Sequence, residues 1–228
     1  MARTTTKGTC HFCQQVLGKT AMTRHLETCP QRAVSFATAH GKPSAKPARL
    51  LHLRAEGLDA PSYWMHLEIP ADASLQTLDS FLRTSWLECC GHLSRFEIHG
   101  TSYSSYVDPE FGDKSMHVQV GQILEIGDQF VHEYDFGTTT ELRLKVLAER
   151  EGVRQKKAVE LLAHNLPPAI PCDVCGKPAT EICSQCVYDE GGLLCEACAS
   201  QHACGEEMLL PVVNSPRMGM CGYDGPGL

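Results

Sequence analysis

The chain has 228 residues, of which 43% are hydrophobic and 21% charged, a composition that is typical of a folded globular protein and excludes extensive disorder. Its apolar runs are far shorter than the ~20 residues that cross a bilayer, and its first ten residues are polar, so neither membrane insertion nor export is expected. The net charge is -7, yet residues 1–54 hold nine lysines and arginines against a single acid. We therefore expect a cytoplasmic protein with a basic N-terminal part and an acidic remainder.

Thirteen cysteines in a chain without an export signal indicate metal binding rather than disulfides, because the cytosol keeps thiols reduced. In the first group, two residues separate Cys10 from Cys13, and His25 and Cys29 follow four apart on one helix face. These four ligands suit tetrahedral Zn²⁺. Residues 1–32 are therefore predicted to form a zinc finger with a ββα core.

The basic charge of this finger suggests contact with nucleic acid. In fingers that read bases, the positions that correspond to Gly18, Ala21 and Arg24 contact base edges, and the first two have no side chain that can hydrogen-bond a base. Phosphate contact is therefore expected rather than sequence-specific reading. The alternative is a solvated basic segment without a ligand. The candidate phosphate contacts are Lys7, Lys19, Arg24 and Arg32.

Residues 33–48 are rich in Pro, Gly, Ser and Lys, which predicts a basic linker. Residues 49–168 form the predicted central domain, where alternating apolar residues indicate strands and a helical spacing from Leu75 to Trp86, capped by Ser74, indicates a helix. The expected fold class is α+β, with an antiparallel sheet and one main amphipathic helix. The predicted strands lie at residues 51–55, 63–69, 96–98, 116–120, 130–136, 142–148 and 158–163, of which the last is alternatively a helix.

Several short motifs of this domain occur in the same order in a known family. They are Leu51-His52-Leu53, Tyr63-Trp64, Trp86 at the helix end, Gly91-His92-Leu93 and Tyr134-Asp135-Phe136-Gly137. Over residues 49–164 this order resembles the plasmid pRiA4b open-reading-frame-three-like family, which includes passenger proteins of mobile elements. The resemblance implies an α+β fold and no particular activity. The chain departs from many members in having Trp64-Met65-His66 where they have Trp-Arg-Arg.

Two features of this domain allow a catalytic interpretation. Cys89 and Cys90 precede His92, and a thiol beside an imidazole is how a nucleophile is activated. We favour a packed helix end instead, because free cysteine is among the most buried residue types. Asp135 is similarly expected to accept amides of a turn in which Gly137 has a positive φ. No catalytic residue is predicted, and an enzyme is not the favoured function.

The C-terminal cysteines form the strongest pattern of the sequence. Three pairs with a two-residue spacing and a closing His-x-Cys supply eight ligands for two Zn²⁺. The spacing resembles B-box and MYND-like cross-braced fingers, which implies that the first and third pairs share one ion and the remaining four residues share the other. The implied sets within residues 169–210 are Cys172, Cys175, Cys195 and Cys198, and Cys183, Cys186, His202 and Cys204, with Cys221 as an alternative to Cys204.

Three Zn²⁺ are therefore expected. The double zinc module has Lys177 against seven acids, so it is expected to repel phosphate and to bind a protein segment. Residues 211–228 are predicted to be an irregular tail. The predicted function is a zinc-binding intracellular interaction or adaptor protein, with a link to mobile elements implied by the resemblance. The alternative is a nonspecific nucleic-acid-binding accessory factor that acts through residues 1–54.

Overall fold

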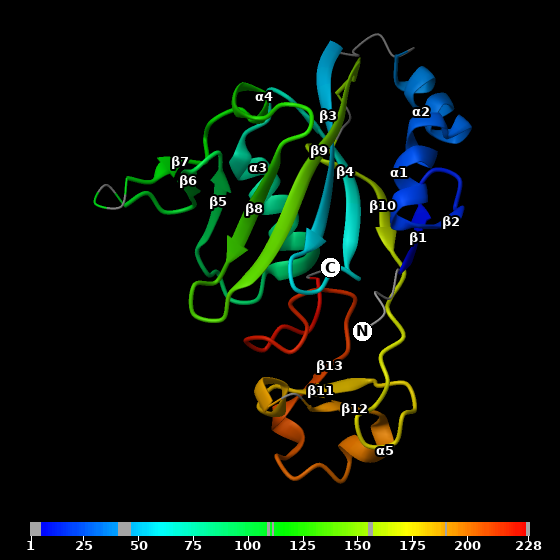
Figure 1. Ribbon diagram of the computed structural model, residues 1–228, viewed down its shortest axis with the longest axis vertical. Coiled ribbons are helices and arrows are strands. Elements are labelled where there is room, and N and C mark those ends of the chain that lie inside the picture. Colours follow the sequence, from blue (N-terminus) through cyan, green and yellow to red (C-terminus); the bar gives the residue numbers. More distant parts are fainter. Residues whose placement is uncertain are drawn as a thin grey trace. The chain divides into compact units, whose positions relative to one another are not determined.

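The structure is a computed structural model that describes residues 6–40, 47–108, 110, 112–154, 157–189 and 191–226 (Figure 1). Residues 41–46 of the predicted linker lie outside this part. The chain forms two compact units. Unit 1 contains Met1–Phe81 and Leu93–Leu166, and unit 2 contains Leu82–His92 and Pro167–Leu228. These boundaries differ from the five predicted segments, because the finger belongs to the same unit as the sheet and unit 2 includes a segment from the middle of the chain.

Unit 1 is built on a ten-stranded sheet with the order β2-β1-β10-β4-β3-β9-β8-β5-β6-β7. Neighbouring strands pair antiparallel except β6 and β7, which are parallel, so the sheet is mixed. With few helices beside it, this sheet gives an α+β architecture. The strands are β1 (Lys7–Cys10), β2 (Val16–Gly18), β3 (Pro47–Gly57), β4 (Trp64–Pro70), β5 (Ser94–Ile98), β6 (Thr101–Ser104), β7 (Lys114–Ser115), β8 (Gln129–Tyr134), β9 (Thr140–Val153) and β10 (Glu160–Asn165).

One face of the sheet is apolar and packs on the helix α3 (Leu75–Leu82). Ser74 begins this helix as expected, since its hydroxyl accepts a hydrogen bond from the Thr77 amide at 3.2 Å. A π-helical turn, η1 (Arg83–Leu87), continues α3 to the predicted helix end. Between α3 and β8, the fully buried Asp79 and His132 form a pair at 2.8 Å. The helix therefore covers the apolar core and also carries one buried polar contact.

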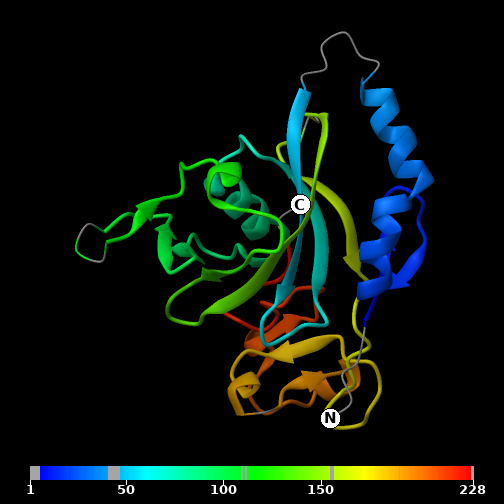
Figure 2. The ribbon, with the colours of Figure 1, turned by 45° about the horizontal axis from the view of Figure 1, so that its top comes forward.

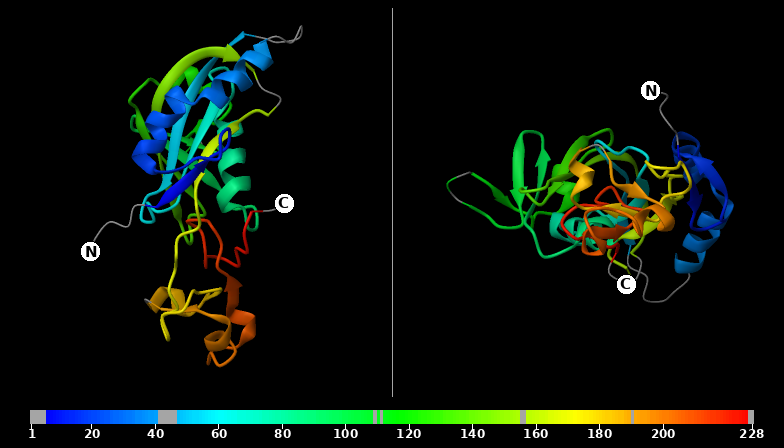
Figure 3. Two further views of the ribbon diagram at one scale, coloured as in Figure 1. Left: turned by 90° about the vertical axis from the view of Figure 1, so that its right-hand side faces the viewer. Right: turned by 90° about the horizontal axis from the view of Figure 1, so that it is seen from below.

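The opposite face of the sheet is polar, because alternation along β4 turns His66 and Glu68 away from the apolar core. Helices α1 (Lys19–Thr28) and α2 (Pro30–His40) lie on this side of the strands (Figures 2 and 3). Arg32 from α2 reaches Glu68, with Nη2 at 2.7 Å from Oε1. The polar face is thus covered from within the same unit.

Two predicted elements are wrong. Residues 33–40 belong to α2 rather than to a linker, since Pro30 occupies the first helical turn, where its missing N–H costs nothing. Residues 116–120 are not a strand: Val120–Ile123 forms the single helical turn α4, and Gln119 makes only an isolated bridge to Ser74. Three alternating apolar residues were too short a signal to separate these possibilities.

Unit 2 contains a three-stranded sheet with the order β12-β11-β13. Its strands are β11 (Glu181–Cys183), β12 (Leu193–Leu194) and β13 (Leu209–Pro211), accompanied by the short helices η2 (Cys186–Asp189), α5 (Glu196–Ala199) and η3 (Glu206–Met208). After β13 the described tail consists of turns, as predicted, yet Ser215, Arg217 and Tyr223 are buried. Within the described ranges of both units, no helix has the length and apolar character needed to cross a membrane.

Candidate metal centres

The N-terminal finger brings its four predicted ligands together. The β1–β2 hairpin supplies Cys10 and Cys13, α1 supplies His25, and Cys29 follows α1 directly. Their ligand atoms lie within 4.8 Å of one another. The Sγ atoms of Cys10 and Cys29 are 4.0 Å apart, and Nε2 of His25 is 3.2 Å from Sγ of Cys13. Two thiols are buried and two ligands are half-buried, so the arrangement fits a closed metal site.

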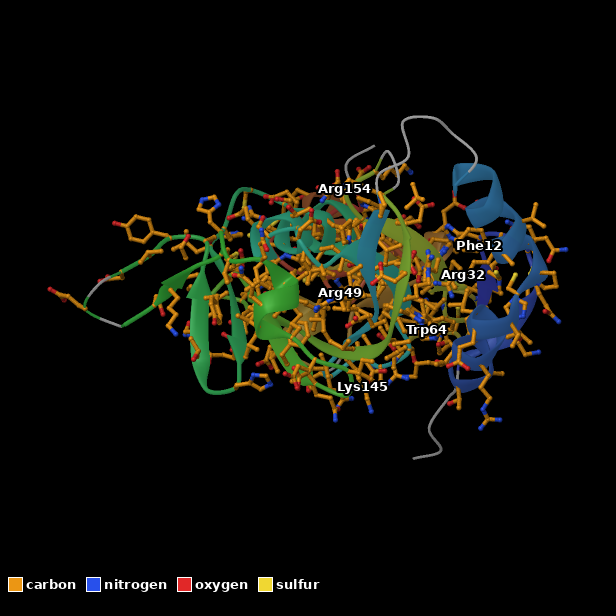
Figure 4. The ribbon with its side chains drawn as sticks, turned by 90° about the horizontal axis from the view of Figure 1, so that it is seen from above. Phe12, Arg32, Arg49, Trp64, Lys145 and Arg154 are labelled. Carbon is orange, nitrogen blue, oxygen red and sulfur yellow. The ribbon has the colours of Figure 1, made fainter. Side chains whose placement is uncertain are left out.

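The finger is docked on the sheet rather than free. Strand β1 pairs with β10, and the buried Cys10 and Cys29 share a core cluster with Trp64. Phe12 packs against the same cluster, and Figure 4 shows Phe12, Arg32 and Trp64 where the finger meets the strands. The Trp64 indole N–H also donates to the Thr6 hydroxyl at 3.0 Å. Finger and sheet therefore share one apolar core.

Two of the four predicted phosphate contacts form ion pairs with carboxylates of the sheet. Nζ of Lys19 lies 2.5 Å from Oε2 of Glu56, and Arg32 is only 7% exposed in its pair with Glu68. The cations thus neutralise buried carboxylates on the polar face of the sheet. Lys7 and Arg24 are exposed. The charges of Lys19 and Arg32 are paired inside unit 1, which favours Lys7 and Arg24 among the four candidate phosphate contacts, and the contact itself stays a prediction.

The C-terminal module places its ligands in two sets of four. One set is Cys172, Cys175, Cys195 and Cys198, and the other is Cys183, Cys186, His202 and Cys204. The sets interleave along the chain, which is the cross-braced grouping that the spacing implied. Sulfur–sulfur distances of 3.6 Å from Cys175 to Cys195 and from Cys186 to Cys204 show that the members of each set face one another. The fourth member of the set that contains His202 is Cys204 rather than Cys221.

Backbone amides favour the deprotonated form of two thiols of this module, those of Cys172 and Cys183. Burial acts to raise the pKa of Cys172, but hydrogen bonds from the backbone of Cys195 and Cys175 outweigh it and lower the pKa to about 6. The same balance lowers the pKa of Cys183 to about 7. Gly176 supports the first knuckle with a φ of 74°, the left-handed region that glycine adopts without strain. These thiols are therefore prepared for the deprotonated form that binds metal.

A fourth cluster was missed by the sequence analysis. Cys89, Cys90, His92 and Cys221 lie together within unit 2, with ligand atoms within 4.8 Å of one another. The expected packed helix end is wrong for Cys90, which is exposed. The sequence offered no spacing signal here, because more than a hundred residues separate the first three members from the fourth.

The turn after β8 has a structural role. Asp135 is 4% exposed, and its carboxylate accepts hydrogen bonds from the Gly137 amide at 3.0 Å and the Thr138 hydroxyl at 2.6 Å. The amide contact agrees with the prediction. The positive φ, however, lies at Asp135, with a value of 65°, rather than at Gly137. Asp tolerates this region because its short side chain bonds to the local backbone.

Comparisons with known proteins add little to this description. No protein-family model matches the chain, and a search of curated proteins finds no match. Among solved structures, the crystal structure of a protein of unknown function from Methanosarcina mazei Go1 is similar, with 15% sequence identity and a TM-score of 0.41 over 51% of this chain and 68% of that chain. At this level of similarity no function is transferred, and the resemblance of residues 49–164 to the pRiA4b family stays a prediction.

Proposed function

We propose that this chain is a zinc-binding interaction or adaptor protein. Three structural Zn²⁺ would be held by the N-terminal finger and by the two sets of the C-terminal module. The donor chemistry supports zinc, since each set is a group of four thiols or of three thiols and one imidazole. Each set is closed, because four protein ligands complete a tetrahedron and leave no position for a reacting water. The ions would therefore maintain structure while another surface binds the partner.

The observation that carries the proposal is an acidic groove on the C-terminal module. It has a volume of about 540 Å³ and lies entirely within unit 2. Three carboxylates line it, and the apolar part comes from β13, the edge strand of the small sheet. The lining residues are Thr180, Glu181, Glu196, Glu206, Leu209, Leu210 and Pro211. No lysine or arginine is among them.

This lining determines the chemistry of the partner. Carboxylates attract lysine and arginine side chains, whereas Leu209 and Leu210 offer apolar surface to an apolar side chain. An edge strand also provides backbone groups to which an extended peptide can add. The occupant that fits is therefore a basic protein segment with interspersed apolar residues. A nucleic acid is excluded from this groove by the repulsion between phosphates and the three carboxylates.

Binding of a labelled peptide of alternating lysine and leucine to the zinc-loaded chain tests this function. Fluorescence anisotropy should show saturable binding, and a peptide of alternating glutamate and leucine should not bind. The double variant Glu181→Gln and Glu206→Gln should weaken binding about five- to tenfold, since each lost charge pair contributes on the order of 0.5 kcal/mol. The double variant Glu110→Gln and Glu125→Gln is the matched control, because both residues are exposed, lie in unit 1 and carry the same two charges. An equal loss in this control would show that binding reflects net charge and would refute the groove.

The alternative, a nonspecific nucleic-acid-binding accessory factor, is less well supported. Only Lys7 and Arg24 of the four candidate cations are exposed, and two separated charges release few counterions from a phosphate backbone. Membership in the pRiA4b family, and with it a link to mobile elements, remains part of the proposal because it is carried only by the motifs of residues 49–164.

A further inference from the structure

Three cysteines have no place in the three proposed zinc sites, and they lie together. Sγ of Cys90 is 3.7 Å from Sγ of Cys89 and 3.7 Å from Sγ of Cys221. Nε2 of His92 completes the group, at 2.9 Å from Sγ of Cys90 and 3.2 Å from Sγ of Cys221. All four residues belong to unit 2.

These distances fit a shared metal ion. A Zn–S bond of about 2.3 Å in a tetrahedron gives sulfur–sulfur edges of about 3.8 Å, and a shorter Zn–N bond gives slightly shorter sulfur–nitrogen edges. A disulfide would instead hold its two sulfurs about 2.05 Å apart. The spacing also matches the other clusters, where the sulfurs of Cys186 and Cys204 are 3.6 Å apart.

The distribution of cysteines over the whole chain supports the same conclusion. The sequence has thirteen cysteines, and every one of them is a member of a four-residue cluster. Three of the clusters take one histidine each, and one takes none. Cys89, Cys90 and Cys221 are thus not leftover core residues. They complete a set of the same size and the same chemistry as the sets that spacing alone had identified.

A buried arginine supplies a second observation. Arg217 is 0% exposed, and its Nη2 donates a hydrogen bond to Sγ of Cys89 at 3.3 Å. Three thiolates and one divalent ion leave one net negative charge, which a guanidinium beside them offsets. Arg217 therefore favours the metal-bound, deprotonated form of the cluster.

The segments that carry the ligands are held in place by other contacts. The buried Ser215 hydroxyl donates to the Trp86 carbonyl at 2.6 Å, three residues before Cys89, and accepts the Arg217 amide at 2.9 Å. Tyr223, two residues after Cys221, is also buried. The C-terminal tail thus lies against the segment that contains η1, and their ligands are positioned together before any ion binds.

We infer that Cys89, Cys90, His92 and Cys221 bind a fourth Zn²⁺, which joins the segment 82–92 to the C-terminal tail. The inference goes beyond the proposed function and needs no partner. None of these ligands is buried, and Cys90 and Cys221 are exposed, whereas every other cluster has at least one buried thiol. The fourth ion is therefore the first to be lost to a competing chelator.

Native mass spectrometry of the zinc-loaded full chain tests the site. The wild type should carry four Zn²⁺, Cys221→Ser should carry three, and His117→Ala, which removes an exposed histidine outside the clusters, should carry four. A wild-type chain with three Zn²⁺ would overturn the inference and leave the three sites of the proposed function intact. A wild-type chain that carries four Zn²⁺ but binds no peptide would refute the groove and leave the fourth site intact, so the failure of one proposal is distinguishable from the failure of the other.

If Cys221→Ser destabilises unit 2, alkylation of the wild-type chain provides an independent test of the fourth site. In the zinc-loaded protein, iodoacetamide should label Cys90 and Cys221 slowly despite their exposure, because metal-bound thiolates are protected. A limiting amount of chelator should expose these two thiols, with Cys89, before any other cysteine. Rapid labelling of Cys90 and Cys221 before chelation would show free thiols and refute the site.

Discussion

Two histidines on the polar face of the sheet are held without charge by their surroundings. Nε2 of His52 lies 2.9 Å from Nδ1 of His66, and both side chains are buried. Burial, followed by the positive charges of Arg32, Arg150 and Arg54, lowers the pKa of His52 to about 3. Burial and His52 itself hold the pKa of His66 well below its usual value. Unit 1 therefore folds with both imidazoles neutral.

Neutral histidines make the stability of unit 1 depend on pH. In the unfolded chain His52 binds a proton below about pH 6.5, whereas in the folded chain it does so only near pH 3, so the unfolded state gains protons first. Stability is full above pH 6.5 and falls as the pH decreases toward 3, by up to about 1.4 kcal/mol per pH unit for one histidine. Relative to wild type, His52→Asn should therefore become less destabilising as the pH falls from 7.5 to 5. Urea unfolding at the two pH values measures this, and an unchanged difference between the two proteins would contradict the pKa assignment.

Close approach of the finger strand to the sheet depends on a glycine. A methyl group at Gly8 would overlap the His164 carbonyl oxygen and the Trp64 ring, whereas one at Gly18 would meet nothing within 4 Å. Gly8→Ala should therefore destabilise unit 1 by about 1–3 kcal/mol, because β1 must move away from β10. Gly18→Ala, in the same finger, should change stability by less than about 0.5 kcal/mol. Equal effects of the two changes on urea unfolding would show that the finger does not share the core of the sheet.

At the scale of elements, we expect the stability of the cross-braced module to depend on bound Zn²⁺. Cys172 belongs to one of its two sets, and structural Zn²⁺ supplies folding free energy on the order of 10 kcal/mol per site. Cys172→Ser should therefore release zinc and open the module to protease after residue 167. Unit 1 has its own sheet and core, so its strands should stay resistant. Ser200→Ala, an exposed change in the same module, is the control, and joint digestion of both units in Cys172→Ser would contradict their independence.

Elements with strong local signals could be predicted from the sequence. The ββα finger followed from ligand spacing, the strand at β9 from a long alternation, and α3 from helical spacing. Elements that depend on distant partners could not be predicted. Arg32 of helix α2 pairs with the buried carboxylate of Glu68, which is distant in sequence. The composition of residues 33–48 alone suggested a linker. The β6–β7 pair, with Lys114–Ser115 as its second strand, is too short to leave a pattern.

The same distinction applies to the candidate sites. Within each predicted cluster the ligands are close in sequence, so their regular spacing is enough to indicate metal binding. In the fourth cluster only the fold brings Cys221 beside Cys90, and no local rule relates the two. The phosphate contacts were overestimated for a related reason. The sequence shows that Lys19 and Arg32 are basic, but it does not show that they form ion pairs with Glu56 and Glu68 in the fold.

For the whole molecule, the fold gathers all thirteen cysteines into four Cys/His clusters of four residues, each of which could hold a metal ion. One group belongs to unit 1, where the finger extends the large sheet, and three belong to unit 2. Two of these three form the cross-braced module, and the third gathers the segment Leu82–His92 with the tail. Cys/His clusters that could hold metal are thus common to both units, and partner binding is proposed for the acidic groove of unit 2.

The number of Zn²⁺ bound per chain tests this account most directly. Native mass spectrometry of the purified full chain measures the number of bound Zn²⁺. Iodoacetamide mapping of its thiols identifies the cysteines that bind them. We predict four Zn²⁺ per chain and protection of all thirteen cysteines until a chelator is added. One Zn²⁺ or none, with rapid labelling of the cysteines from Cys172 to Cys204, would contradict it.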